Sequence, residues 1–559
     1  MPRATLSFRR VEALVPSRPT RARLEELLFA SKAQAEGGSG DELLLEGTAD
    51  RLDLLTESGL GLYLQGATGA SVGLPPLVHG GTAPLTIEVD PSVDPLRPEI
   101  AAVVVAPPSG HTLEAELLDE AIRFQELLHA TIGLNRRLAS LGIYPVERIR
   151  GPVRYSRDPL SEVRFVPLDG DLEVDGAEFY GHHPMAARFG ELGRLEDTCL
   201  VLRDSAGSIL SLPPVLNSRG SGEARPGDGA LLLESTGTRS SRVEDAVGLL
   251  SMVFIAHGWS VAGVRVTGPR GGSDGSAVTR PRSVHLSPAT IARVAGAEFA
   301  SHEVVQLLEA ARLGVHPLPH GWRIEVPPWR PDLLAPVDLV EELVLARGLR
   351  PEDGIVPPSA TRGRRSPQAR FREHLRDLLL GLGLVPLYTP VLVSERMVVL
   401  GQREGSVALA NPVSDQFARM RDSIAVPLLQ VLERNVRHGY PQRISEVGPV
   451  LRVASGSESG AETRDHAGVF LAHESAGFAE VAALADYLLR TFGTTGVREP
   501  AELPGTIPGR AAVLRLAGES VAEMGEIAPS VLRELRVPVP VAWVEWDLTA
   551  LRPLVERAR

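Results

Sequence analysis

The stretch PPWRPDLLAPVDLVEELVLARG, residues 327–348, combines an apolar helical pattern with several acidic side chains. Pro336 suits the first turn of a helix and Gly348 suits its end, so the pattern predicts a helix between them. The acidic residues are Asp332, Asp338, Glu341 and Glu342. The last three stand three and four positions apart, which predicts that they share one face of the helix.

Two interpretations of these carboxylates are open. If a turn brings Asp332 alongside the helix, the carboxylates converge and repel one another unless a cation lies among them. Oxygen ligands of this kind favour Mg²⁺. In the other interpretation, the acids complement the dipole of the first helical turn and lie on a solvated face. Spacing alone does not decide between a metal site and an ordinary surface helix.

The bulk composition limits what the chain can be. Its 559 residues suffice for about three to five domains of ~150 residues each. The net charge of −12 means that any contact with RNA must come from local basic surfaces. Cys199 is the single cysteine, which excludes intrachain disulfides and cysteine-based metal centres and favours a cytoplasmic setting. Apolar runs fall far short of the ~18 residues of a membrane span, so no membrane partner is expected.

The chain contains a single lysine, Lys32. It stands between Ser31 and Ala33, so it cannot complete the Gly-Lys-Ser/Thr sequence of a phosphate-binding loop. Kinase-type phosphoryl transfer and Schiff-base chemistry also require a lysine. These classes of enzyme are therefore close to excluded.

Alternating helical and strand patterns predict a multidomain α+β protein. The predicted domains comprise residues 1–88, 91–265, 276–356 and 366–559. In the first domain, GLGLYLQG at 59–66 is predicted to be strand-like. In the second, the periodic stretch at 117–142 is predicted to form one long helix. Residues 349–367 are rich in proline, glycine and arginine and are predicted to be a linker.

Residues 327–348, called the opening stretch below, resemble a segment of phenylalanyl-tRNA synthetase beta subunits. In that segment, aromatic-Arg-x-Asp precedes D-L-x-E-[DE] and a helix that ends at glycine. Further resemblances to this family follow in its own order along the chain. They are the looser TADRLDLLTESGLG (48–61), GLNRRLASLGIYPVERI (133–149), LRDSAGSILSLPPVLNS (202–218), ALANPVSDQFARMRDSIAVPLLQVLERN (408–435), YPQRISEVGPV (440–450) and TIPGRAAVLRLAGESVAEMGEIAPSVL (506–532). The second and third of these resemble the archaeal and eukaryotic branch.

The resemblance implies an (αβ)₂ heterotetramer with an alpha subunit, which attaches phenylalanine to tRNA(Phe) using ATP and Mg²⁺. It implies that 276–356 is a small metal-binding-type domain, with Mg²⁺ assigned to the four carboxylates of the opening stretch. It also implies that 366–559 is a class II synthetase-like antiparallel-sheet domain. Arg443 and Glu446 resemble part of an ATP site there, but the Gly-rich strand with a second phosphate-binding arginine is missing. No residue of this chain is therefore expected to catalyse aminoacylation.

The resemblance further implies that residues 91–265 form a tRNA-editing-type domain, which hydrolyses tyrosine wrongly attached to tRNA(Phe). Tyrosine differs from phenylalanine by one hydroxyl, which an apolar pocket rejects only weakly, so a second site that bonds the hydroxyl can remove the error. The candidate residues are Ser211 and Asn217, which flank the rigid Pro-Pro of SLPPVLNS, and Glu234, where the branch usually has Asp. For each of them, ordinary turn or strand hydrogen bonding is the alternative.

Two other functions stay open at this point. One is a stand-alone editing hydrolase that clears mischarged tRNA without a partner, although the long C-terminal synthetase-like block argues against it. The other is a non-enzymatic RNA-binding scaffold. The arginine-dense stretches at 135–157 and 361–376 are candidates for phosphate contact in any of these functions.

Overall fold

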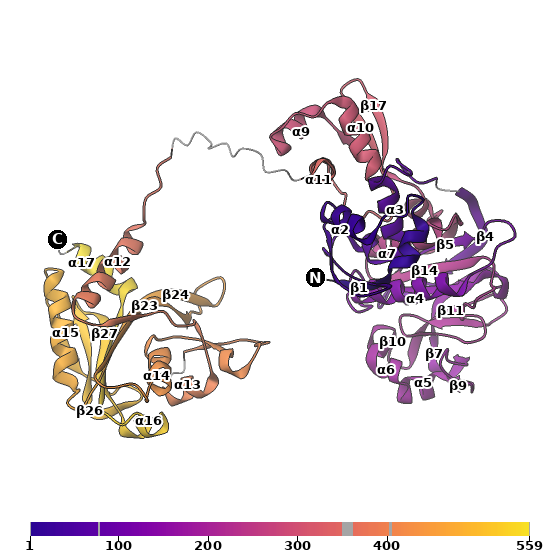
Figure 1. The fold of residues 1–559 in the computed structure, drawn as a ribbon. Coiled ribbons are helices and arrows are strands. Elements are labelled where there is room, and N and C mark those ends of the chain that lie inside the picture. Colours follow the sequence, from indigo (N-terminus) through magenta and orange to yellow (C-terminus); the bar gives the residue numbers. More distant parts are fainter. Residues whose placement is uncertain (1, 77–78, 349–360, 402–404, 558–559) are drawn as a thin grey trace. The chain divides into compact units, whose positions relative to one another are not determined.

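The computed structural model describes residues 2–76, 79–348, 361–401 and 405–557. The chain forms two compact units, Met1–Gly354 and Ile355–Arg559, both drawn in Figure 1. Helices and strands occur in both units, as the predicted α+β class requires. Most of the predicted linker, residues 349–360, lies outside the described residues.

The first unit alternates strands and helices. Its strands are β1 (Arg3–Ser7), β2 (Ala33–Gly37), β3 (Glu42–Gly47), β4 (His79–Val89), β5 (Glu99–Ala106), β6 (Ala139–Pro145), β7 (Val153–Pro159), β8 (Arg164–Phe165), β9 (Val174–Asp175), β10 (Arg194–Leu195), β11 (Thr198–Arg203), β12 (Ile209–Leu212), β13 (Leu216–Asn217), β14 (Leu231–Gly237), β15 (Ser260–Thr267), β16 (Arg282–Leu286), β17 (Gly314–Leu318) and β18 (Gly321–Val326). Its helices are α1 (Phe8–Leu14), α2 (Arg21–Phe29), α3 (Glu57–Ala67), α4 (Ala115–Ala130), α5 (Gly176–His182), α6 (Pro184–Phe189), α7 (Ser240–Ile255), α8 (Ser276–Thr279), α9 (Pro288–Ala295), α10 (Ser301–Ala310) and α11 (Pro336–Arg347).

A large sheet forms the centre of this unit, with the strand order β13-β12-β11-β7-β4-β15-β5-β14-β6 and β10 paired with β11. Successive residues of a strand point to opposite faces of a sheet. Leu231 and Leu233 of β14 accordingly join one core, whereas Leu232 joins another. The sheet is therefore covered on both faces. Because β4 is one of its strands, the sheet begins before the domain boundary predicted at residue 88.

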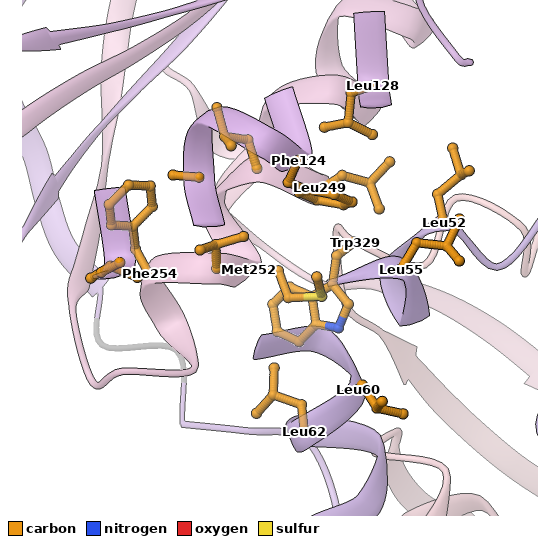
Figure 2. Packing of buried hydrophobic residues seen from close by; sticks show 14 of the residues in the cluster. Leu52, Leu55, Leu60, Leu62, Phe124, Leu128, Leu249, Met252, Phe254 and Trp329 are labelled. Carbon is orange, nitrogen blue, oxygen red and sulfur yellow. The ribbon is translucent and has the colours of Figure 1, made fainter. Parts of the chain in front are cut away.

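Helices α4 and α7 cover the first face of the large sheet. Figure 2 shows Leu249 and Met252 of α7 among the side chains of this core, together with Phe124 of α4 and Trp329. All four side chains are at most 4% exposed. This core also contains residues from α1 to α3, so it joins the N-terminal segment to the large sheet.

Two predictions about helices in this unit are wrong. The stretch predicted to be strand-like at 59–66 lies in α3, whose glycines allow close packing. A Cβ at Gly61 would lie 2.7 Å from Leu14 Cβ, and one at Gly66 would overlap a backbone oxygen of α10. The long helix predicted at 117–142 ends at Ala130. Residues 134–136 have left-handed backbone angles, with φ between 48° and 65°, which interrupt a right-handed helix before β6.

The opening stretch belongs to a small layer of three strands, in the order β16-β18-β17, packed with α9, α10 and α11. This layer has its own apolar core, which includes Leu339, Val340 and Leu343 of α11. The helix predicted between Pro336 and Gly348 is confirmed, since α11 runs from Pro336 to Arg347. Its apolar side chains thus fix the helix against the small sheet.

The second unit is built on one larger sheet. Its strands are β19 (Val385–Leu387), β20 (Leu392–Val393), β21 (Val407–Ala408), β22 (Arg419–Met420), β23 (Gln442–Val453), β24 (Ala461–Ala472), β25 (Val497–Pro500), β26 (Thr506–Leu516), β27 (Glu519–Ile527) and β28 (Val541–Asp547). Its helices are α12 (Pro367–Gly381), α13 (Glu395–Leu400), α14 (Ala425–Arg434), α15 (Phe478–Thr491), α16 (Pro529–Glu534) and α17 (Leu548–Arg557).

The larger sheet of the second unit has the strand order β19-β23-β24-β28-β27-β26-β25. The short β19 pairs with β23 in parallel, and the other neighbours pair antiparallel. Helices α12, α15 and α17 pack on one face, and α13, α14 and α16 pack on the other. In the described part of the chain, none of the helices combines the length and the apolar character needed to cross a membrane.

Candidate functional site

A cavity of about 350 Å³ lies in the first unit. Its walls come from both ends of the strand order, with β6 and β14 on one side and β12 and β13 on the other, so the large sheet curves around it. Side chains of α4 close a further side. The volume is within the range of small-molecule sites.

The three candidate editing residues, Ser211, Asn217 and Glu234, all line this cavity. Ser211 and Glu234 are 2% and 3% exposed, whereas Asn217 is half-buried and its Nδ2 donates to the Gly222 carbonyl oxygen at 3.1 Å. Tyr144 connects the two buried residues, because its hydroxyl lies 2.9 Å from Ser211 Oγ and 2.9 Å from Glu234 Oε1. Three strands thus place the polar side chains of Tyr144, Ser211 and Glu234 next to one another, although these residues are far apart in sequence.

Glu234 is the electrostatically unusual group of the cavity. Burial raises the pKa of its carboxyl to about 7, although the hydrogen bond from Tyr144 and the charge of Arg97 act in the opposite direction. Oxygen Oε2 is buried and has no hydrogen-bond partner among the described residues. A buried carboxylate oxygen without a partner is costly, so the cavity offers an acceptor to a ligand that brings a donor.

A second polar group lines the same cavity and was not predicted. Arg136 donates from Nη1 to the carbonyl oxygens of Pro214 and Val215, each at 3.0 Å, and from Nη2 to Glu126 Oε1 at 2.9 Å. Burial would raise the pKa of Glu126, but His129 and Arg136 outweigh it and hold this pKa at about 2. Arg136 therefore fixes the Pro-Pro loop between Ser211 and Asn217. Arg136 lies in the arginine-dense stretch at 135–157, which the sequence pattern indicated as a candidate for contact with RNA phosphates and not as part of a cavity.

The carboxylates of the opening stretch lie elsewhere in the first unit. Asp332 and Glu342 flank Arg330, whose Nη2 lies 2.8 Å from Asp332 Oδ2 and 2.8 Å from Glu342 Oε1. Arg51 adds a second guanidinium, 3.8 Å from Glu342 Oε1. All four side chains are at most 5% exposed. Burial disfavours the charged carboxylates, but the arginines outweigh it and lower the pKa of both Asp332 and Glu342.

The other two carboxylates point to different places. Asp338 Oδ2 accepts hydrogen bonds from the backbone N–H groups of Leu334 and Ala335, at 2.8 Å and 2.7 Å, at the start of α11. Glu341 is 53% exposed and its Oε2 lies 2.8 Å from Lys32 Nζ. The prediction that the three helical acids share one face is wrong. Glu342 is buried beside Arg330 and Arg51, whereas Glu341 is largely exposed to solvent.

This arrangement tests the fit of Mg²⁺. Within the described residues, no group of three or more His, Cys, Asp and Glu side chains is placed to hold a metal ion. The oxygens of Asp332 and Glu342 already accept from Arg330, and an oxygen of Asp338 accepts from backbone N–H groups. The four carboxylates therefore do not fit one common ion in this conformation.

In the second unit, the residues that resemble part of an ATP site are already engaged. Arg443 Nη1 lies 3.1 Å from Glu480 Oε1. Glu446 is fully buried and pairs with Arg421 at 2.8 Å, and it also accepts from Thr389. Glu446 is thus a buried anion neutralised by Arg421, whereas Arg443 is a partly exposed arginine with one ion-pair partner.

Comparison with known proteins agrees with the order of motifs along the chain. A family profile described as "Phenylalanyl tRNA synthetase beta chain CLM domain" matches residues 355–548, and one described as "tRNA synthetase B5 domain" matches residues 284–349. The solved N-terminal fragment of the phenylalanyl-tRNA synthetase beta subunit from Pyrococcus horikoshii has a similar fold, with a TM-score of 0.57 at 22% identity. The structural similarity covers 62% of this chain and 100% of that fragment. Both profiles are those of aminoacyl-tRNA synthetase chains.

Full-length relatives are more specific. The phenylalanine–tRNA ligase beta subunit of Halobacterium salinarum is 30% identical over 557 residues, covering 95% of this chain and 96% of the relative. That of Natronomonas pharaonis is 31% identical over 560 residues, covering 94% and 96%. The chain therefore belongs to the family of phenylalanine–tRNA ligase beta subunits, and the resemblance drawn from its sequence motifs is confirmed.

Proposed function

We propose that this chain works with an alpha subunit, as an (αβ)₂ phenylalanine–tRNA ligase, and that its cavity hydrolyses tyrosine wrongly attached to tRNA(Phe). The observation that carries the hydrolytic part is the cavity itself. It brings Ser211, Asn217 and Glu234 together and leaves one buried oxygen of Glu234 without a partner among the described residues.

The chemistry of the cavity suits a tyrosyl group. Apolar side chains such as Leu118, Leu141 and Ile143 line it, and they would hold the aromatic ring of either tyrosine or phenylalanine. A tyrosine hydroxyl would donate to the free oxygen of Glu234. A phenylalanine ring would cover that oxygen without pairing it, which costs binding free energy. Glu234 therefore distinguishes the two amino acids.

The reaction is the hydrolysis of an aminoacyl ester. Water adds to the ester carbonyl, the bond between that carbon and the tRNA oxygen breaks, and the products are free tyrosine and free tRNA(Phe). The residues named here hold the side chain and orient the loop around it. Arg136 has this second role, since it ties the Pro213–Val215 backbone to α4 through Glu126.

Aminoacylation itself belongs to the alpha subunit in this proposal, and ATP and Mg²⁺ are used there. The second unit supports the assembly without binding ATP, because the sequence lacks the Gly-rich strand with a second phosphate-binding arginine and because Glu446 is buried against Arg421. Local arginine-rich surfaces, such as that of residues 361–376, would contact tRNA(Phe).

The test uses the complex of this chain with its alpha subunit. Purified tRNA(Phe) charged with tyrosine or with phenylalanine is mixed with the complex, and release of each amino acid is followed. We expect release of tyrosine to exceed release of phenylalanine, and Glu234→Gln to reduce the difference. Charging of tRNA(Phe) with phenylalanine should be unchanged by Glu234→Gln, which controls for assembly. Equal, slow release of both amino acids by the unmodified complex would refute the hydrolytic proposal.

A further inference from the structure

We infer that Tyr144 is a positioning residue of this cavity, whose fixed phenol holds one oxygen of Glu234 and thereby leaves the other oxygen for the hydroxyl of a bound tyrosyl group. This inference rests on the proposed hydrolysis of tyrosyl-tRNA(Phe). It deepens that proposal by naming the residue on which the selection of tyrosine over phenylalanine depends.

The direction of the hydrogen bonds follows from the chemistry of a phenol. Burial and the neighbouring Glu234 raise the pKa of Tyr144 well above its ordinary value, so the hydroxyl keeps its proton. A phenol has one proton to donate. When it donates to Glu234 Oε1, the Ser211 hydroxyl is left to donate to the Tyr144 oxygen. The chain of bonds therefore runs from Ser211 through Tyr144 to Glu234 and ends at Oε1.

The position of Tyr144 is set by the two paired strands. Tyr144 is 1% exposed and packs in the core on the second face of the large sheet with Val104 and Leu232. Gly142, two residues earlier on β6, is the register partner of Glu234 on β14. A Cβ at Gly142 would overlap the Tyr144 hydroxyl, so only glycine leaves room for the phenol beside Glu234. The phenol of Tyr144 is thus a fixed part of the cavity wall, held in place by the packing around it.

This geometry explains selectivity in terms of which oxygen is free. With Oε1 engaged, the carboxylate presents Oε2, which has no hydrogen-bond donor in the described part of the chain. Without the Tyr144 hydroxyl, both oxygens would lack a hydrogen-bond donor among the described residues, and the bond that fixes which oxygen faces the ligand would be lost. The carboxyl would also keep its proton to higher pH, because the bond from Tyr144 favours the charged form.

The deciding experiment replaces Tyr144 by phenylalanine, which removes one oxygen atom and keeps the ring. In the complex with the alpha subunit, we expect Tyr144→Phe to lower the preference for tyrosyl-tRNA(Phe) over phenylalanyl-tRNA(Phe) by about tenfold or more in kcat/KM. We also expect the acidic limb of its pH profile to move to higher pH, since the ionised carboxylate is the acceptor.

Tyr155→Phe is the matched control. Tyr155 is equally buried in the same core, but its hydroxyl donates to the Arg97 carbonyl oxygen at 2.9 Å and not to Glu234. A general loss of packing or stability would affect both variants alike. We expect Tyr155→Phe to keep the preference and the pH profile of the unmodified complex.

The outcomes separate this inference from the proposal on which it rests. If the unmodified complex prefers tyrosyl-tRNA(Phe) and Tyr144→Phe keeps both the preference and the pH profile, the positioning role is refuted while the hydrolytic function stands. If the unmodified complex shows no preference, the hydrolytic function is refuted and the positioning role with it. A selective loss in Tyr144→Phe alone supports both.

Discussion

Arg330 holds two buried carboxylates at once, and its removal should be severe. Arg330→Met would leave Asp332 and Glu342 buried, close to each other and facing only the more distant Arg51. We expect a loss of about 3–5 kcal/mol in the free energy of unfolding at pH 7, as for other broken buried pairs. Denaturant unfolding of the full chain measures it. The exposed pair of Glu341 and Lys32 is the control, and Glu341→Gln should cost at most about 1 kcal/mol.

The same carboxylates predict a dependence on acid. Their pKa values are lowered in the folded chain, so they stabilise it above their ordinary, unfolded pKa of about 4, and this stabilisation is lost as the pH falls through the lower folded values. The unmodified chain should therefore lose stability below about pH 4. Arg330→Met should show a smaller loss over that range, because its carboxylates no longer have low pKa values. Parallel pH curves for the two proteins would contradict this.

Glu234 predicts the opposite trend at higher pH. Its folded pKa of about 7 lies above the ordinary 4.5, so its contribution to stability is fully present below pH 4.5 and is lost as the pH rises through 7. The difference corresponds to about 3 kcal/mol. Glu234→Gln cannot ionise and should flatten this decline between pH 5 and 8. Unfolding curves of both proteins across that range measure it, and an equal decline would contradict the assignment.

Within helix α11, Asp338 is the third residue, and its side chain caps the start of the helix by bonding back to the N-cap residue, Ala335. The carboxylate accepts two backbone N–H groups that precede the first turn. Asp338→Ala should cost about 1 kcal/mol of unfolding free energy, whereas Asp338→Asn keeps an acceptor oxygen and should cost less. Equal losses for the two variants would show that the negative charge, and not the hydrogen bonds, is what the helix requires.

The surroundings of α11 also predict how the chain responds to metal removal. Its four carboxylates face arginines, a lysine and backbone N–H groups, and they do not share one site. We expect a chelator, or added Mg²⁺, to leave the unfolding midpoint of the isolated chain unchanged within error. A stoichiometric Mg²⁺ content, lost together with several degrees of Tm on chelation, would show that these side chains rearrange around an ion.

At the scale of the whole molecule, the two compact units have separate apolar cores. The cores of the first unit and those of the second share no residue. Chains comprising residues 1–354 and 355–559 should each unfold cooperatively when produced separately. The cavity is formed entirely by the first unit, so its pH-dependent stability should persist in the fragment 1–354. A first fragment without a cooperative transition would show that its fold depends on the second unit.

Much of the fold was predictable because it depends on residues that are near one another in sequence. The helix between Pro336 and Gly348 follows from a proline that suits a first turn, a glycine that suits an end and the apolar spacing between them. The order of the family motifs was likewise a property of the sequence alone. In the candidate cavity, Ser211, Asn217 and Glu234 were predicted from their motifs, and all three line it.

The rest depends on contacts between residues that are far apart in sequence. Helix α3 is buried on most sides and lacks the amphipathic period that would mark it, so the sequence pattern did not identify it as a helix. Tyr144 meets Ser211, and Arg136 meets the Pro213–Val215 backbone, because the sheet curves and brings its two ends together.

The four acids of the opening stretch show the division most clearly. By itself, the sequence determined their number, their spacing and the helix that carries three of them. The tertiary structure decided their partners: Arg330 for Asp332 and Glu342, Lys32 for Glu341, and backbone N–H groups for Asp338. The physical reason is that burial disfavours the charge of a carboxyl group and a nearby cation stabilises it, and tertiary contacts set both.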